Sequence, residues 1–213
     1  MTLFQDAIKV ISFDADGTLA TPEFADAIWH REIPRLYAQK NKMSFKEAKR
    51  HVLAEYQKVG EHRVEWYDAK YWFQRFGLGD LQPVFNSLSY KISYYPEVEE
   101  VLSSLGQRYQ LIIASNSPHY YLDLLLAAIR GYFSRIFSSV SDYNEVKKEA
   151  FFLRLCREMK VKPQQMVHVG DHFEFDFIVP KQAGITAFFL DRRKQKEEGV
   201  TDLKEFAARL GLS

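Results

Sequence analysis

The chain alternates short apolar runs with longer stretches in which apolar residues recur every three or four positions. The short runs are rich in β-branched or aromatic residues, which is typical of strands buried in a parallel sheet. The predicted strands span 7–13, 111–114, 136–139, 166–169 and 186–190. The longer stretches predict helices, among them 98–105, 118–130, 152–159 and 203–210. This alternation predicts an α/β fold, a doubly wound and mostly parallel sheet with helices on both faces.

One long segment near the start of the chain departs from this alternation. Residues 21–89, called the helical insertion below, show no pattern of a buried strand. Their apolar spacing predicts helices over 23–41, 44–59 and 64–76. Ser44 and Glu47 have the spacing of a capping box, which supports a helix start at Ser44. We therefore expect a core domain and a smaller all-helical cap domain, formed by residues 1–20 with 90–213 and by residues 21–89.

Net charge and cysteine content exclude several classes of protein. The 213 residues include 29 Lys and Arg against 28 Asp and Glu, a net charge of +1, whereas a general nucleic-acid binder carries a large basic excess. The single cysteine, Cys156, excludes a disulfide framework and a Cys-rich zinc site. No apolar run could span a bilayer, and residues 1–10 lack a secretory signal. We expect a cytoplasmic protein without nucleic-acid or membrane partners; the sequence does not predict its oligomeric state.

Polar side chains follow the predicted strands, at the edge where sheets of this kind bind ligands. They are Asp14 and Asp16 after the first strand, Ser115 and Asn116 after the second, Lys147 and Lys148 before the helix at 152–159, and Asp171 with Asp176 after the strand at 166–169. Carboxylate oxygens suit a hard cation such as Mg²⁺, which also engages phosphate. A carboxylate can attack phosphorus, and a hydroxyl and an ammonium can hold phosphoryl oxygens. Together these groups favour metal-assisted chemistry on a phosphate.

The first two of these groups resemble motifs of the haloacid dehalogenase (HAD) superfamily. Residues 14–19 read Asp-Ala-Asp-Gly-Thr-Leu and look like its first motif. Ser115 with Asn116, after a hydrophobic strand, looks like its second motif. The resemblance extends over nearly the whole chain, and four motifs in the family's order are far more specific than one.

The other two groups resemble the third and fourth motifs of the same superfamily. Lys147 looks like the third-motif lysine, but that motif commonly reads Lys-Pro and Lys148 follows here, so Lys148 is an alternative. Gly170-Asp171 with Asp176 resembles the fourth motif. The resemblance implies a Rossmann-type core with a cap inserted after the first motif.

The resemblance also implies a magnesium-dependent phosphatase that acts on a small phosphorylated metabolite. Asp14 would attack phosphorus and form an aspartyl-phosphate. Asp16 would protonate the leaving group and then activate the water that cleaves the intermediate. Mg²⁺ would be held by Asp14, the backbone carbonyl of Asp16 and Asp171, with Asp176 in support. The phosphoryl group would be bound by Ser115, Asn116 and Lys147.

Asp16 favours phosphate-ester chemistry within the superfamily, because dehalogenases resemble this sequence at Asp14 but lack the acid two residues later. Phosphomutases share that acid, so a mutase or another phosphotransferase is an alternative. A non-catalytic binding protein of the same fold is a further alternative, which the intact motifs disfavour. His168 lies within a strand pattern and is predicted to be a core residue rather than a ligand.

The helical insertion carries an aromatic stretch that allows two interpretations. Trp66, Ala69 and Phe73 share one helical stripe and are predicted to form the core of the cap. A ring off that stripe would be free to wall a substrate pocket. Three cationic residues would either meet an anionic part of the substrate or face solvent: Arg31, Arg63 and Lys70.

Overall fold

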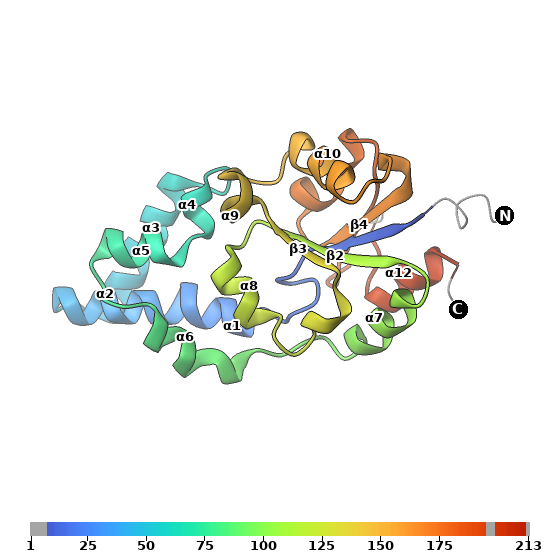
Figure 1. Cartoon of the computed structure of the whole chain (residues 1–213). Coiled ribbons are helices and arrows are strands. Elements are labelled where there is room, and N and C mark those ends of the chain that lie inside the picture. Colours follow the sequence, from blue (N-terminus) through green and yellow to red (C-terminus); the bar gives the residue numbers. More distant parts are fainter. Residues whose placement is uncertain (1–7, 195–198, 212–213) are drawn as a thin grey trace.

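A five-stranded parallel sheet forms the core of the molecule (Figure 1). The computed structural model describes residues 8–194 and 199–211. The strands are β1 (Val10–Phe13), β2 (Gln110–Ser115), β3 (Arg135–Ser138), β4 (Met166–Gly170) and β5 (Thr186–Phe189), in the order β3-β2-β1-β4-β5. This confirms the predicted α/β fold with a doubly wound sheet. Ala7, the predicted start of the first strand, lies outside the described residues.

Helices cover both faces of this sheet. The core elements are α7 (Val98–Gly106), α8 (His119–Leu125), η3 (Arg130–Tyr132), α9 (Ser139–Tyr143), α10 (Glu149–Glu158), η4 (Pro163–Gln165), η5 (Phe173–Ile178), α11 (Val179–Gln182) and α12 (Leu203–Arg209). Ile11 and Phe13 pack with the apolar residues of α7 and α12, while Val10 and Ile112 pack with those of α10. Figure 1 shows α10 on one side of the sheet and α7 with α12 on the other. Within the described ranges, no helix is both long and apolar enough to cross a membrane.

The parallel register brings the carboxyl ends of three strands to one edge. Phe13 of β1 pairs with Ile113 of β2 and with Val169 of β4. The residue after Phe13, Asp14, donates its backbone N–H to the carbonyl oxygen of Val169 at 3.0 Å. The polar residues after β1, β2 and β4 are therefore neighbours, as such sheets require at a ligand site.

The helical insertion lies beyond these strand ends, on the left in Figure 1. Its elements are α1 (Glu23–Asp26), η1 (Ala27–Glu32), α2 (Ile33–Asn41), α3 (Phe45–Val59), α4 (Val64–Tyr67), α5 (Ala69–Phe76), α6 (Gln82–Leu88) and η2 (Ser89–Lys91). The structure describes every residue of this segment, and its regular elements are all helices. The predicted capping box is present, since the backbone N–H of Glu47 donates to Oγ of Ser44 and the Ser44 N–H donates back to the Glu47 carboxylate.

The predicted helix over 64–76 is interrupted at Asp68. The carboxylate of Asp68 accepts the backbone N–H of Lys70 at 2.9 Å and so caps α5. The same oxygen accepts the hydroxyl of Tyr120 at 2.8 Å, from helix α8 of the core. Tyr120 lies 52 residues further along the chain and stabilises the interruption at Asp68. The local apolar spacing does not reveal this contact. The helix predicted from Pro118 to Arg130 also ends early, at Leu125.

This break changes which aromatic rings fill the interior of the insertion. Ala69 and Phe73 are buried as predicted, but Trp66 is only half-buried. Trp72, which lies off the predicted stripe, is fully buried. The predicted stripe requires one continuous helix. The interruption at Asp68 changes the direction in which the side chains of α5 point relative to those of α4. Trp66 is consequently available to face the site.

Candidate active site

A cavity of about 420 Å³ lies between the carboxyl edge of the sheet and the helical insertion, and we call it the chamber. Its core side contains the predicted site residues together with Ser117, Tyr121, His172 and Phe175. The predicted residues that line it are Asp14, Asp16, Ser115, Asn116, Lys147, Asp171 and Asp176. The structure thus brings every predicted site residue into one cavity.

Lys147 lies among these groups and joins two carboxylates. Its Nζ donates to Oδ1 of Asp14 and to Oδ1 of Asp176, each at 2.6 Å, and its side chain is only 2% exposed. Burial opposes the ammonium charge, but the two carboxylates outweigh burial and raise the pKa of Lys147 above its usual value. Lys148 is exposed at the start of α10. Of the two lysines, the geometry therefore favours Lys147.

Asp176 fixes the position of Lys147. Its Oδ1 also lies 3.1 Å from Nε2 of His168, and its Oδ2 accepts the backbone N–H of His172 at 3.0 Å. Although burial favours the protonated form, Lys147 and His168 lower the pKa of Asp176, so this carboxylate stays ionised. His168 is fully buried, as predicted, and its Nδ1 lies 3.0 Å from Oγ of Ser12. Both carboxylate oxygens of Asp176 thus have hydrogen-bond partners within the protein, which suits the predicted role of Asp176 in support of the metal site.

Asp14 stands at the end of the central strand with one oxygen committed to Lys147. The residue is 7% exposed, and Lys147 binds Oδ1, so Oδ2 is the oxygen that remains for a substrate or a metal. Burial raises the pKa of Asp14, against the opposing charge of Lys147. A nucleophilic carboxylate must be ionised, and a cation next to Asp14 would lower that pKa again.

Asp16 is held by two hydroxyl groups that the sequence interpretation did not include. Tyr121 Oη donates to Oδ1 of Asp16 at 2.8 Å, and Ser117 Oγ donates to Oδ2 at 3.2 Å. Burial raises the pKa of Asp16 to about 7; the Tyr121 hydrogen bond opposes this rise and the charge of Asp14 adds to it. A carboxyl group with such a pKa can both give and take a proton near neutral pH.

Two glycines allow the acidic groups to approach one another. Gly17 has a φ of +71°, and a Cβ there would lie 2.2 Å from Oδ2 of Asp171. A Cβ on Gly170 would lie 2.4 Å from Cγ of Asp176. Any side chain at either position would displace a carboxylate, so both motif glycines are required by packing, and Gly17 also by its left-handed backbone.

The donor set fits a hard divalent cation. Asp14, Asp171 and Asp176 offer carboxylate oxygens that all lie within 4.8 Å of one another. Enclosure in the chamber and the charges of Asp14 and Asp176 raise the pKa of Asp171 well above its usual value. Three acidic groups thus face one ammonium, Lys147, and a bound cation would balance this excess. The predicted contribution of the Asp16 backbone carbonyl stays a prediction.

Asn116 and Ser115 organise the loop after β2. Oδ1 of Asn116 accepts the backbone N–H of Lys147 and the hydroxyl of Ser139, each at 2.7 Å. Asn116 therefore braces the segment that carries Lys147, a structural task in addition to the predicted phosphate contact. Oγ of Ser115 accepts the backbone N–H of Ser117 at 3.2 Å, and its own hydroxyl hydrogen can point elsewhere.

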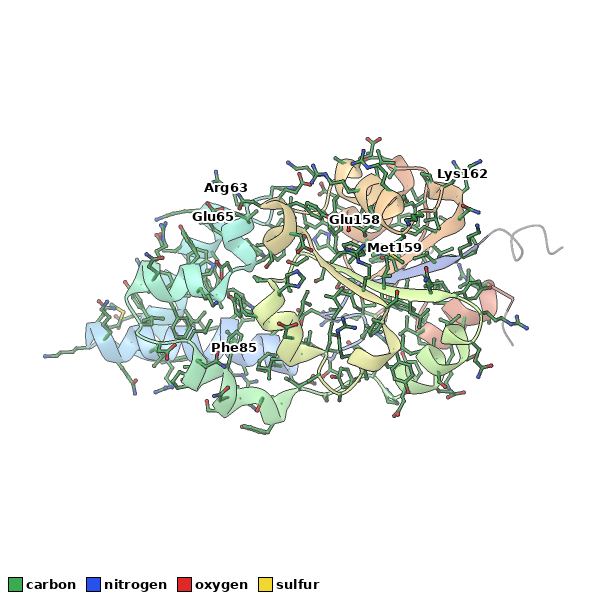
Figure 2. The ribbon with its side chains drawn as sticks, viewed as in Figure 1. Arg63, Glu65, Phe85, Glu158, Met159 and Lys162 are labelled. Atoms are coloured by element: carbon green, nitrogen blue, oxygen red, sulfur yellow. The ribbon has the colours of Figure 1, made fainter. Side chains whose placement is uncertain are left out.

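The helical insertion supplies the opposite wall of the chamber, called the roof below. Its lining residues are Ala25, Trp29, His30, Leu53, Tyr56, Gln57, Trp66 and Tyr67. The cationic residues considered from the sequence, Arg31, Arg63 and Lys70, do not line the chamber. Arg63 instead pairs with Glu65 at 2.9 Å on the outer side of the insertion (Figure 2).

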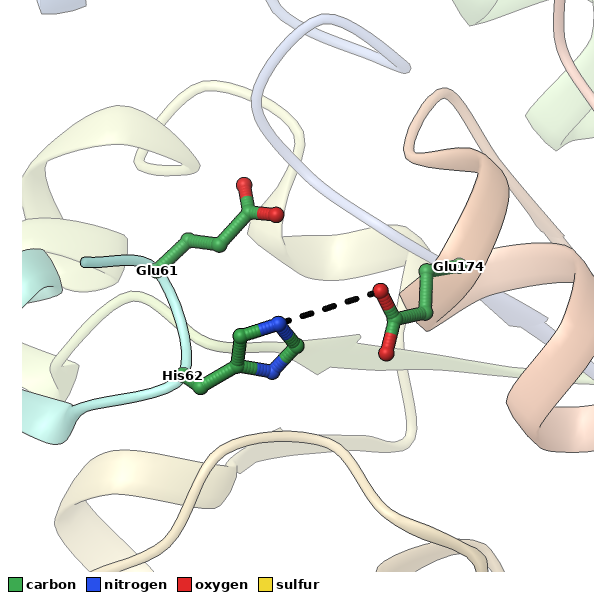
Figure 3. A group of neighbouring side chains, drawn as sticks. All are labelled: Glu61, His62 and Glu174. Carbon is green, nitrogen blue, oxygen red and sulfur yellow. Dashed lines mark ion pairs between the residues drawn. The ribbon is translucent and has the colours of Figure 1, made fainter.

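Two histidine–carboxylate pairs join the insertion to the core beside the chamber. Nε2 of His62 lies 3.9 Å from Oε2 of Glu174 (Figure 3), and Nε2 of His172 lies 3.3 Å from Oε2 of Glu61. Glu61 and His62 come from the loop between α3 and α4, whereas His172 and Glu174 follow β4. The ring of His172 thus contacts the insertion at the margin of the site.

A parallel sheet that carries a buried Asp–Lys–Asp cluster at its carboxyl edge, with helices inserted after the first strand, defines an α/β protein with an acidic site at its strand ends. A family model for haloacid dehalogenase-like hydrolases matches residues 8–184. The chain belongs to this family, and it is a hydrolase.

Solved structures and a curated relative agree with this assignment. A HAD phosphatase from Thermococcus onnurineus is 26% identical, with a TM-score of 0.86 over 97% of this chain and 99% of that one. The HAD-hydrolase YfnB from Bacillus subtilis, solved with bound magnesium, shares the fold, with 16% identity and a TM-score of 0.69 over 96% and 99% of the two chains. The GMP/IMP nucleotidase YrfG from Escherichia coli (strain K12) is 30% identical over 71 residues, about a third of either chain (33% and 32%).

Proposed function

We propose that the protein is a Mg²⁺-dependent phosphatase that hydrolyses a small phosphomonoester through an aspartyl-phosphate. The observation that carries this proposal is the pairing of two aspartates with different partners on one turn. Asp14 is bound to the Lys147 ammonium, whereas Asp16 accepts hydrogen bonds from the hydroxyls of Tyr121 and Ser117, and burial raises its pKa to about 7. One group suits nucleophilic attack and the other suits proton transfer.

In the first step, a carboxylate oxygen of Asp14 attacks phosphorus and the bond from phosphorus to the leaving oxygen breaks. Asp16 gives its proton to that oxygen, so the product leaves as an alcohol. Lys147 offsets the charge of Asp14 and of the phosphoryl oxygens, and Ser115 donates to one of these oxygens. Asp14 and Asp171 would hold Mg²⁺, which would supply electrostatic stabilisation of the transferring group.

In the second step, Asp16 acts as a base. Its carboxylate, left ionised by the first step, takes a proton from water as the water oxygen attacks phosphorus. The bond between phosphorus and Asp14 breaks, phosphate is released, and both aspartates return to their initial states. Tyr121 and Ser117 hold the Asp16 carboxyl in place through both steps.

Release of phosphate from simple phosphomonoesters, with Mg²⁺ and with EDTA, tests this function. We expect turnover that requires the metal and is lost in Asp14→Asn. Asp123→Asn is a matched control, because Asp123 is an exposed carboxylate that does not line the chamber. Turnover that survives EDTA, or full activity in Asp14→Asn, contradicts the proposal.

A phosphomutase is the second candidate, because Asp16 serves that chemistry equally well. It would produce an isomerised sugar phosphate and little free phosphate in the same assay. The substrates named for the curated relative, GMP and IMP, place nucleoside monophosphates in the first panel of esters to test.

A further inference from the structure

The roof of the chamber is built around three interlocked aromatic rings. Tyr56 lies between two tryptophans, with its ring centroid 5.9 Å from that of Trp29 and 6.3 Å from that of Trp66, both in edge-to-face geometry. The Tyr56 hydroxyl donates to the carbonyl oxygen of Trp29 at 3.3 Å. Tyr56 is buried, whereas Trp29 and Trp66 are half-buried and line the cavity. The roof is therefore a preformed aromatic surface.

Tyr67 connects this aromatic surface to the reacting groups. It lines the same cavity as Asp14, and its hydroxyl donates to the backbone carbonyl of Glu61 at 3.0 Å. Burial raises the pKa of Tyr67, so the phenol stays neutral. A molecule whose phosphate lies at Asp14 can thus extend past Tyr67 to the tryptophans without leaving the cavity.

The roof contains no lysine or arginine, and the structure describes every residue of the insertion that forms it. A second phosphate or a carboxylate on the substrate would find no cation of these types there. Polar contacts come instead from His30 and the Gln57 carboxamide, both exposed side chains at the margin of the cavity. A carboxamide carries a donor and an acceptor side by side, as the edge of a nucleobase also does.

We propose that the leaving group is a nucleoside, its base packed against Trp29 and Trp66 and its edge within reach of Gln57. This inference rests on the proposed phosphatase function and names the substrate class for it: nucleoside 5′-monophosphates. Every nucleobase has a π-face that stacks on aromatic side chains. The cavity of about 420 Å³ is in the range of pockets for molecules of this size, roughly 300–1,000 Å³. Short esters with a second anionic group, such as phosphoglycolate, would leave the aromatic surface unused.

The first test compares esters that differ only in the base. We expect kcat/KM for inosine, guanosine or adenosine 5′-monophosphate to exceed that for ribose 5-phosphate by about tenfold or more, the effect of one stacked base. Equal values for ribose 5-phosphate and the nucleotides overturn this inference but leave the phosphatase function intact. Phosphate release from no ester at all overturns the phosphatase function instead.

The second test locates the base at the roof. Trp66→Leu should lower kcat/KM for the preferred nucleotide by about tenfold, mainly through KM, and leave ribose 5-phosphate unaffected. Trp66→Phe should restore most of the loss. Tyr90→Leu is the control, since this ring is 76% exposed and lies outside the chamber. A loss of equal size for ribose 5-phosphate would show a structural defect and overturn the assignment of Trp66.

A binding measurement tests the same contact without turnover. Guanosine 5′-monophosphate added to the Asp14→Asn protein should quench tryptophan fluorescence, because two of the three tryptophans line the chamber. The quenching should fall when Trp66→Leu is added to that protein, while ribose 5-phosphate should quench neither. Undiminished quenching in the double variant would place the base elsewhere.

Discussion

Tyr121→Phe removes one hydroxyl group and should move the alkaline limb of the pH profile of kcat/KM to higher pH. Tyr121 Oη donates a 2.8 Å hydrogen bond to Asp16 and so favours the ionised form of that carboxyl. The ring itself is packed against Phe24 and Phe85, and phenylalanine keeps that packing. The substitution therefore keeps the packing of the ring and removes the hydrogen bond that favours ionised Asp16.

The size of the shift follows from the lost hydrogen bond. A hydrogen bond to a charged group contributes about 1.5–3 kcal/mol, and one pKa unit corresponds to about 1.4 kcal/mol. The pKa of Asp16 is about 7 with the bond in place. Without it the pKa should rise by about one to two units. Asp16 must be protonated when the ester bond breaks, so the alkaline limb of the profile should move to higher pH by the same amount.

The assay is kcat/KM for one phosphomonoester across pH, which reports groups of the free enzyme. Tyr120→Phe is the matched control, because the hydroxyl of Tyr120 binds Asp68 in the insertion and not Asp16. Its alkaline limb should stay at the wild-type position. If the alkaline limb of Tyr121→Phe stays at the wild-type pH or moves to lower pH, the assignment of Asp16 as the acid is refuted. An equal shift in both variants would refute it as well.

Three further perturbations have defined outcomes. The pKa of Asp16 is about 7 in the folded protein against an ordinary 3.8, so the folded protein binds this proton more tightly and Asp16 makes stability fall as pH rises through that interval. Asp16→Asn should make the fall smaller, as measured by urea unfolding at both ends. Lys147→Met removes the ammonium that two buried carboxylates share and should cost about 3–5 kcal/mol of unfolding free energy as well as activity, whereas Lys148→Met should change neither. Gly17→Ala places a Cβ against Asp171 and should raise the Mg²⁺ concentration needed for half-maximal activity; an unchanged requirement would contradict the metal assignment.

Much of the core follows from local patterns in the sequence. The buried strands are short apolar runs, and the parallel pairing of β1 with β2 and β4 brings the polar residues after them together. Asp14 and Ser115 are neighbours for this reason, although 101 positions separate Ser115 from Asp14 in the sequence. The position of a motif at a strand end can thus be predicted from the sequence, because the carboxyl ends of parallel strands meet at one edge of the sheet.

The contacts that sequence patterns missed depend on long-range packing. Tyr121 reaches Asp16 only because α8 leaves the end of β2 beside β1; the nearest local signal is its position three residues after Pro118. The break at Asp68 depends on Tyr120, which no local spacing reveals. That break also leaves Trp66 half-buried at the chamber and Trp72 in the interior of the insertion, whereas the apolar spacing predicts Trp66 in the core of the cap.

We expect Asp14 to become phosphorylated during turnover, and a labelling experiment can detect this intermediate. Asp16→Asn should slow the second step, because it removes the base that activates water. With p-nitrophenyl phosphate, whose leaving group departs without protonation, the first step should still proceed, and rapid acid quenching followed by peptide mapping should find the phosphoryl group on Asp14. Label on another residue, or turnover of this ester by Asp14→Asn at the wild-type rate, would contradict the account.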